Sequence, residues 1–78
     1  MVNLTLLLED MARAIVDNPD EVKATERVEN DEVILTLTVA ESDMGMVIGK
    51  RGNIARAIRT IAKAAGKLSD RKVSVEIR

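Results

Sequence analysis

The segment Val47-Ile48-Gly49-Lys50-Arg51-Gly52-Asn53-Ile54 (residues 47–54) is the most informative part of this sequence. Two glycines enclose two cationic residues, and apolar residues stand on both sides. Glycine at both ends of so short a loop permits unusual φ values and lets another backbone approach closely. A helix that starts after the loop offers free N–H groups and a positive dipole end to phosphate, and the cations add donors. We therefore expect this loop to hold phosphate groups.

Helices are predicted on both sides of the loop. Ser42 and Asp43 are suitable N-caps for a short helix that ends at the loop. After the loop, a second helix is predicted from an N-cap at Asn53 to about Ala65, and Gly66 is expected to end it. The loop is thus predicted to join two helices, which is the setting in which its amide groups can bind an anion.

Another helix and three strands account for the rest of the chain. Apolar residues at helical spacing predict a helix over residues 4–16, with Asn3 as its N-cap and Asn18-Pro19 as its end. Alternating apolar residues predict a weaker, edge-type strand over residues 21–29 and a strong strand over residues 32–40. Asn30 and Asp31 between them are typical of a hairpin turn. The last strand is predicted to contain Val73, Val75 and Ile77.

The predicted order is α-β-β-α-α-β, and connection rules place the strands. The two helices between the second and third strands form a crossover long enough for a parallel, right-handed pairing. We expect an α/β (α+β) two-layer fold, with a three-stranded mixed sheet, residues 32–40 in its centre and all helices on one face. At 78 residues the chain is expected to form one domain over residues 1–78. No segment resembles a signal peptide or a membrane span, so we expect a cytoplasmic protein without membrane contact.

Charge is balanced in total but unevenly distributed. The formal net charge is −1, from 12 basic and 13 acidic residues. Residues 1–42 carry a net charge of −7, and residues 43–78 carry +6. Between Gly49 and Lys67 there are six basic residues and no acidic one. This asymmetry predicts one face for an anionic partner and another that repels it.

The composition excludes most enzyme chemistry. The chain has no His, Cys, Phe, Tyr or Trp, so it cannot build a zinc finger, a thiolate nucleophile, an imidazole base or an aromatic platform for bases. The loop is not a P-loop, because only three residues separate Gly45 from Gly49 and Arg51 stands where a hydroxyl should bind Mg²⁺. It follows a predicted helix, whereas the dinucleotide fingerprint follows a strand. We expect no catalytic residue, no metal and no cofactor.

The helix predicted after the loop, from Asn53 to about Ala65, has a wider apolar arc than a core-facing helix needs. Its apolar side chains cover about half of the circumference, whereas a core-facing stripe covers roughly 100°. We expect Ala57, Ile61 and Ala64 to extend onto an interface with another protein chain. Because the core is small and has no aromatic residues, burial of further apolar surface against a partner subunit would add stability.

The pattern V-I-G-x-x-G-x-x-I within a β-α-α-β frame resembles the K-homology (KH) domain family. The helix and strand that precede this frame resemble the type II, prokaryotic arrangement. A single domain of this size that opens with an amphipathic helix is similar to the small bacterial KhpA-type RNA-binding proteins. The resemblance implies an RNA-binding protein or RNA chaperone, found as a homodimer or paired with a larger KhpB-type protein.

The resemblance also assigns roles to residues of the loop. Gly49, Lys50, Arg51 and Gly52 would contact the sugar-phosphate backbone of single-stranded RNA, and their neighbours would line an adjacent aliphatic groove. The full set of expected RNA contacts is Ile48, Gly49, Lys50, Arg51, Gly52, Asn53, Ile54, Ala55 and Arg56.

Two other functions compete with RNA binding. A protein-interaction or dimerisation module with weak or no RNA binding is the main alternative, although both residues at the tip of the loop are basic. Binding of duplex DNA through a helix-turn-helix predicts a body of three helices, whereas this sequence has three strand-like segments.

Overall fold

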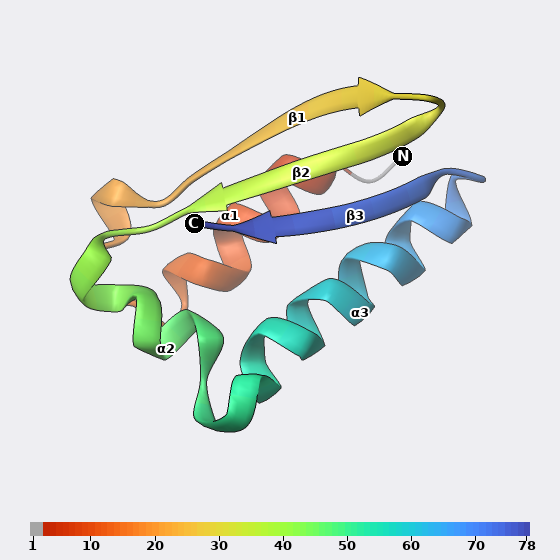
Figure 1. Cartoon of the computed structure of the whole chain (residues 1–78). Coiled ribbons are helices and arrows are strands. Elements are labelled where there is room, and N and C mark those ends of the chain that lie inside the picture. Colours follow the sequence, from red (N-terminus) through yellow and green to blue (C-terminus); the bar gives the residue numbers. More distant parts are fainter. Residues whose placement is uncertain (1–2) are drawn as a thin grey trace.

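A three-stranded sheet lies over three α-helices in the computed structural model, which describes residues 3–78 (Figure 1). All three helices lie on one face of the sheet, with α2 at one end of the layer that α1 and α3 form. The predicted order and the two-layer fold class are confirmed. The elements are α1 (Leu4–Arg13), β1 (Lys23–Glu29), β2 (Glu32–Thr38), α2 (Met44–Ile48), α3 (Asn53–Leu68) and β3 (Lys72–Ile77), with short 3₁₀ turns η1 (Pro19–Glu21), η2 (Glu41–Asp43) and η3 (Lys50–Gly52).

The sheet has the predicted mixed topology, with β2 between the two other strands. β1 pairs with β2 in antiparallel orientation, and β3 pairs with β2 in parallel orientation. Asn30 and Asp31 form the two-residue hairpin turn with φ values of 51° and 66°. Positive φ at both central residues is the signature of the type I′ turn, whose twist matches that of the paired strands. The predicted turn at Asn30 and Asp31 is confirmed, and it sets the register of the hairpin.

The core lies between the sheet and the helices. Val33, Leu35 and Leu37 of β2 are buried, while the residues between them are only partly buried on the open face of the sheet. The core draws on all three helices, on β2 and β3, and on the residue just before β1, so one shared cluster supports every element around the loop. This buried cluster consists of Leu8, Ala12, Val22, Val33, Leu35, Leu37, Val39, Val47, Ile58, Ala62, Val73 and Val75.

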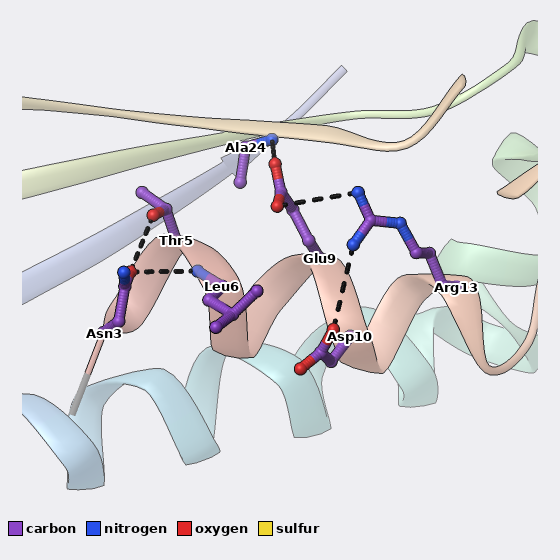
Figure 2. A network of polar contacts seen from close by, with 7 residues as sticks. All are labelled: Asn3, Thr5, Leu6, Glu9, Asp10, Arg13 and Ala24. Carbon is purple, nitrogen blue, oxygen red and sulfur yellow. Dashed lines mark hydrogen bonds and ion pairs between the residues drawn. The ribbon is translucent and has the colours of Figure 1, made fainter. Parts of the chain in front are cut away.

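Polar contacts fix α1 at its start and tie it to the sheet (Figure 2). The Asn3 side chain caps the helix, because its Oδ1 accepts a hydrogen bond from the Leu6 N–H at 3.1 Å. Glu9 Oε2 accepts a hydrogen bond from the Ala24 N–H of β1 at 2.9 Å, and Arg13 forms an ion pair with Glu9. The helix ends at Arg13, three residues before the predicted end.

The end of α3 differs from the prediction. Gly66 lies inside the helix, which continues to Leu68, and Asp70 supplies the left-handed residue of the turn with a φ of 56°. A Cβ at Gly66 would collide with the Val73 side chain and lie 3.0 Å from the Arg71 carbonyl oxygen. The glycine therefore permits close packing of β3 against α3, and it does not terminate the helix.

Candidate nucleic-acid interface

The loop of residues 49–52 is a tight turn that joins α2 to α3. Gly49 has a φ of 75° and a ψ of 175°, and Arg51 is left-handed with a φ of 58°. The Gly52 N–H donates to the Gly49 carbonyl oxygen at 3.1 Å, which closes the turn. The backbone thus adopts conformations with positive φ at three of its four residues.

Gly49 also approaches the first turn of α3 closely. A Cβ at this position would lie 2.5 Å from Ile54 Cγ1, which is much closer than real side chains approach each other. The missing side chain lets Ile54 pack directly against the loop. Contact between the loop and the helix that follows it fixes their relative orientation.

The prediction for the start of α3 was wrong by one residue. Gly52, in the left-handed conformation, is the N-cap, and Asn53 is the first helical residue. Within the described chain no side chain forms a capping hydrogen bond there, and the Asn53 N–H donates to the Lys50 carbonyl oxygen. Asn53 Oδ1 accepts a 3.5 Å hydrogen bond from Arg56. The positive end of the helix dipole favours an anion at this end of α3.

The predicted RNA contacts gather around the loop with one exception. Lys50 and Arg51 are exposed at its tip, and neither forms an ion pair within residues 3–78. Ile48 and Ile54 are 41% and 38% exposed and lie on either side of the loop in the sequence. Ala55 is only 4% exposed and faces the core, so its side chain does not line the surface as predicted.

Helix α3 has three distinct faces. At about 100° per residue, the buried side chains of Ala55, Ile58 and Ala62 occupy one side. The basic side chains lie within an arc of about 80° next to the core face; they are Arg56, Arg59, Lys63 and Lys67. Arg59 Nε donates to the Val75 carbonyl oxygen of β3 at 3.4 Å, which places this basic face toward the edge of the sheet.

The third face of α3 is apolar and exposed. Ala57, Ile61 and Ala64, the predicted interface residues, are all exposed, and Ile61 is 46% exposed. Ile54 and Leu68 extend the same row at both ends, and Leu68 is 85% exposed. Leu68 was not predicted as part of this row because the helix was expected to end before it. The row has the alternating spacing of three and four residues that forms the seam of a coiled coil.

Asp43 anchors the segment that carries the loop. Its carboxylate is 1% exposed and accepts hydrogen bonds from the Asn18 N–H at 2.9 Å, the Asn18 side-chain amide at 3.1 Å and the Asp17 N–H at 3.3 Å. The residue was predicted to cap α2, but its side chain makes no capping bond there. It holds the middle of the α1–β1 connection, at Asp17 and Asn18, against the start of α2 instead. No local sequence pattern indicates this long-range contact.

The residues described by the structure offer neither a metal site nor a membrane-crossing helix. Within residues 3–78, no group of three or more His, Cys, Asp or Glu side chains is arranged to hold a metal ion. No helix in that range combines the length and apolar composition that crossing a membrane requires.

Comparisons with known proteins identify the family of this chain. The family model for "KhpA/KhpB, KH domain" matches residues 5–77. The RNA-binding protein KhpA of Clostridium acetobutylicum is 52% identical over 71 residues, which cover 91% of this chain and 95% of that protein. The RNA-binding protein KhpA of Borreliella burgdorferi is 44% identical over 71 residues, with coverage of 91% and 87%.

Solved structures of Era share the fold. Era in complex with MgGDPNP and a segment of 16S ribosomal RNA aligns with a TM-score of 0.64 at 19% identity, over 95% of this chain and 28% of Era. A variant of Aquifex aeolicus Era bound to GDP and aluminium fluoride aligns with a TM-score of 0.59 at 19% identity, over 99% of this chain and 31% of that one. At this level of identity the likeness concerns the fold alone.

Proposed function

This chain belongs to the KhpA/KhpB family of KH domains, and we propose that it acts as one KH domain that binds single-stranded RNA at the loop of residues 49–52. The observation that carries the proposal is the pair of exposed cations, Lys50 and Arg51, held in a turn that opens into α3. Relatives that are 52% and 44% identical are named RNA-binding proteins. A role as an RNA chaperone in the cytoplasm belongs to the same proposal.

The chemistry of the loop suits a sugar-phosphate backbone. Lys50 and Arg51 supply charge-assisted donors to phosphate oxygens, and the start of α3 supplies amide groups and a positive dipole end. Ile48 and Ile54 offer exposed aliphatic surface on which bases can rest. The chain has no aromatic residue for stacking, so the energy of binding has to come mainly from phosphate contacts and from shape.

The loop is tested by removing its two charges. We expect Lys50→Ala/Arg51→Ala to bind a fluorescein-labelled pool of random ten-nucleotide RNA about 10-fold more weakly at 50 mM salt. The slope of log affinity against log salt concentration should fall by about 1.4, because each phosphate that a cation neutralises on a single strand contributes about 0.7. Fluorescence anisotropy at several salt concentrations measures both quantities.

Lys23→Ala/Arg27→Ala is the control for net charge, because it removes two positive charges from exposed positions on β1. This variant should keep its RNA affinity within about twofold and its salt slope within about 0.3 of the wild-type value. Equal losses in both double variants would show that net charge, and not the loop, governs binding. Absence of RNA binding by the wild-type protein would favour the alternative of a pure interaction module.

We also propose that the exposed apolar row of α3 pairs with the same row of a second copy of this chain. The paired part of the row consists of Ala57, Ile61, Ala64 and Leu68, and its coiled-coil spacing is self-complementary about a two-fold axis. Ile54, at the end next to the loop, is left for contact with RNA. Alanines at alternate positions let two helices approach closely. A small core without aromatic residues gains stability from such burial. A larger KhpB-type chain that offers a similar row is the other expected partner.

Ile61→Arg tests the interface, because it places a charge in the middle of the row. We expect the wild-type protein to sediment as a dimer at tens of micromolar and the variant to sediment as a monomer, a loss of about 2 kcal/mol or more of association energy. Thr25→Arg is the control, because Thr25 is exposed on β1, outside α3, and this change should leave the dimer intact. A wild-type monomer, or an Ile61→Arg dimer, would contradict the proposed interface.

A further inference from the structure

A basic pocket lies at the far end of α3 from the loop of residues 49–52. It is a shallow, open depression of about 580 Å³, bordered by the last turns of α3, the turn after it, the start of β3 and the first residue of β2. The residues that line it are Glu32, Lys63, Lys67, Asp70, Arg71, Lys72, Val73 and Ser74. Four cations and two carboxylates thus face one cavity, which leaves it with an excess of two positive charges.

The cations of this pocket form no ion pair in the part of the chain that the structure describes. Arg13, Arg27 and Arg78 form all the ion pairs found within residues 3–78, and these pairs lie on α1, on β1 and at the end of β3. Lys67 and Arg71 are exposed, and neither lies within 4.0 Å of a carboxylate oxygen in that range. A cluster of such cations around a cavity creates a local positive potential that attracts an anion.

Basic side chains on one face of α3 stand between the loop and the pocket. Arg56 and Arg59 lie between them on the basic face of α3, and Arg59 contacts the edge of β3 at Val75. From Asn53 to Lys67 the helix rises about 21 Å at 1.5 Å per residue. A strand held at the loop therefore meets a line of cations that leads along α3 to the pocket.

We propose that this pocket is a second phosphate-binding site, which takes the RNA nucleotides that extend beyond those held at the loop. The inference rests on the proposed RNA-binding function and adds to it the length of RNA that the domain binds. A GxxG loop clamps four backbone nucleotides, so a second site along α3 engages strands that are longer than this. Ser74, which is only partly buried, adds a hydroxyl donor for the sugar.

The position of the pocket explains why its ligand is a tethered strand. It lies at the C-terminal end of α3, where the dipole of the helix is negative and opposes an isolated anion. A phosphate that belongs to RNA already bound at the loop arrives at a high effective concentration, which offsets this cost. The second site is therefore expected to bind the extension of a strand far better than it binds inorganic phosphate.

Length dependence separates the two sites. We expect Lys63→Ala/Lys67→Ala to bind a random ten-nucleotide RNA pool about 10-fold more weakly than the wild-type protein, and a random five-nucleotide pool within about twofold. The salt slope for the longer pool should fall by about 1.4, and the slope for the shorter pool should not change. Lys23→Ala/Arg27→Ala is again the control for the removal of two charges, and circular dichroism checks that each variant is folded.

Each outcome has a definite meaning. If Lys50→Ala/Arg51→Ala weakens binding while Lys63→Ala/Lys67→Ala matches the β1 control at both lengths, the second site is refuted and the loop assignment stands. Equal losses for short and long pools would also refute it, because the pocket would then act only through general electrostatics. NMR shifts of the Lys67 and Arg71 amides on titration with inorganic phosphate alone, as large as those with RNA, would indicate a site for free anions instead. No binding of RNA by the wild-type protein would overturn the proposed function itself.

Discussion

Asp43→Ala is expected to lower the free energy of unfolding by about 3 kcal/mol. The buried carboxylate accepts bonds from two backbone N–H groups and one side-chain amide of Asp17 and Asn18, and alanine leaves all three without this partner. Removing one partner of a hydrogen bond to a charged group costs about 1.5 to 3 kcal/mol, and solvation of the partly buried amides limits the sum. Urea unfolding followed by circular dichroism measures the loss.

Two further variants define the cause of this loss. Glu41→Ala removes an exposed carboxylate from the same 3₁₀ turn, η2, and should change stability by less than about 0.5 kcal/mol. Asp43→Asn keeps one acceptor oxygen and should lose about half as much as Asp43→Ala. Unfolding at two protein concentrations separates the effect from a change in association. Similar stability of the Asp43→Ala and Glu41→Ala proteins would contradict the anchoring role.

Gly49→Ala is the second change with a large expected effect, about 3 kcal/mol of stability and more than about 10-fold in RNA affinity. A φ of 75° with a ψ of 175° lies in a region that is essentially restricted to glycine and costs other residues about 1 to 3 kcal/mol. The new Cβ would also collide with Ile54, so the first turn of α3 has to move. Urea unfolding and RNA anisotropy on the same preparations measure the two effects.

Gly45→Ala is the matched control, because a Cβ there meets nothing within 4 Å and the residue lies in α2. Alanine favours a helix by about 1 kcal/mol over glycine, so this variant should be as stable as the wild type or more stable. The double change Gly49→Ala/Ile54→Ala removes the collision but not the backbone strain, so this variant should lose less stability than the sum of the losses in the two single variants. Equal stability of the Gly45→Ala and Gly49→Ala proteins would refute the role assigned to Gly49.

The order of elements could be predicted because it depends on local patterns. Alternation in residues 32–40, the Asn30-Asp31 turn and the Asn3 cap each act over a few residues, and all appear in the structure. The glycine-flanked loop was placed correctly for the same reason. Gly66 was misread because its role is contact with Val73, a residue on a different element, and local sequence does not reveal such a contact.

The site was predictable in position but not in detail. A helical wheel gives the width of the apolar arc of α3, but not which part of it faces the sheet. Packing selects the small residues Ala55 and Ala62 for the core and leaves the larger Ile54 and Ile61 outside. The orientation of α3 about its own axis therefore explains why Ala55 is buried although it was expected in the groove. The anchoring contact of Asp43 was not predicted, because its partners lie about 25 residues away in the chain.

The two hydrogen bonds from helices to the outer strands also bear on aggregation through the edges of the sheet. A strand at the border of a sheet exposes backbone groups that can recruit strands from other molecules and start aggregation. The Glu9 carboxylate accepts a hydrogen bond from the Ala24 N–H on β1, and Arg59 Nε donates one to the Val75 carbonyl oxygen on β3. On the β1 edge a backbone N–H donor is thus paired with a carboxylate, and on the β3 edge a backbone carbonyl acceptor is paired with a guanidinium group. A strand from a neighbouring molecule has to displace a charged side chain before it can extend the sheet at either place.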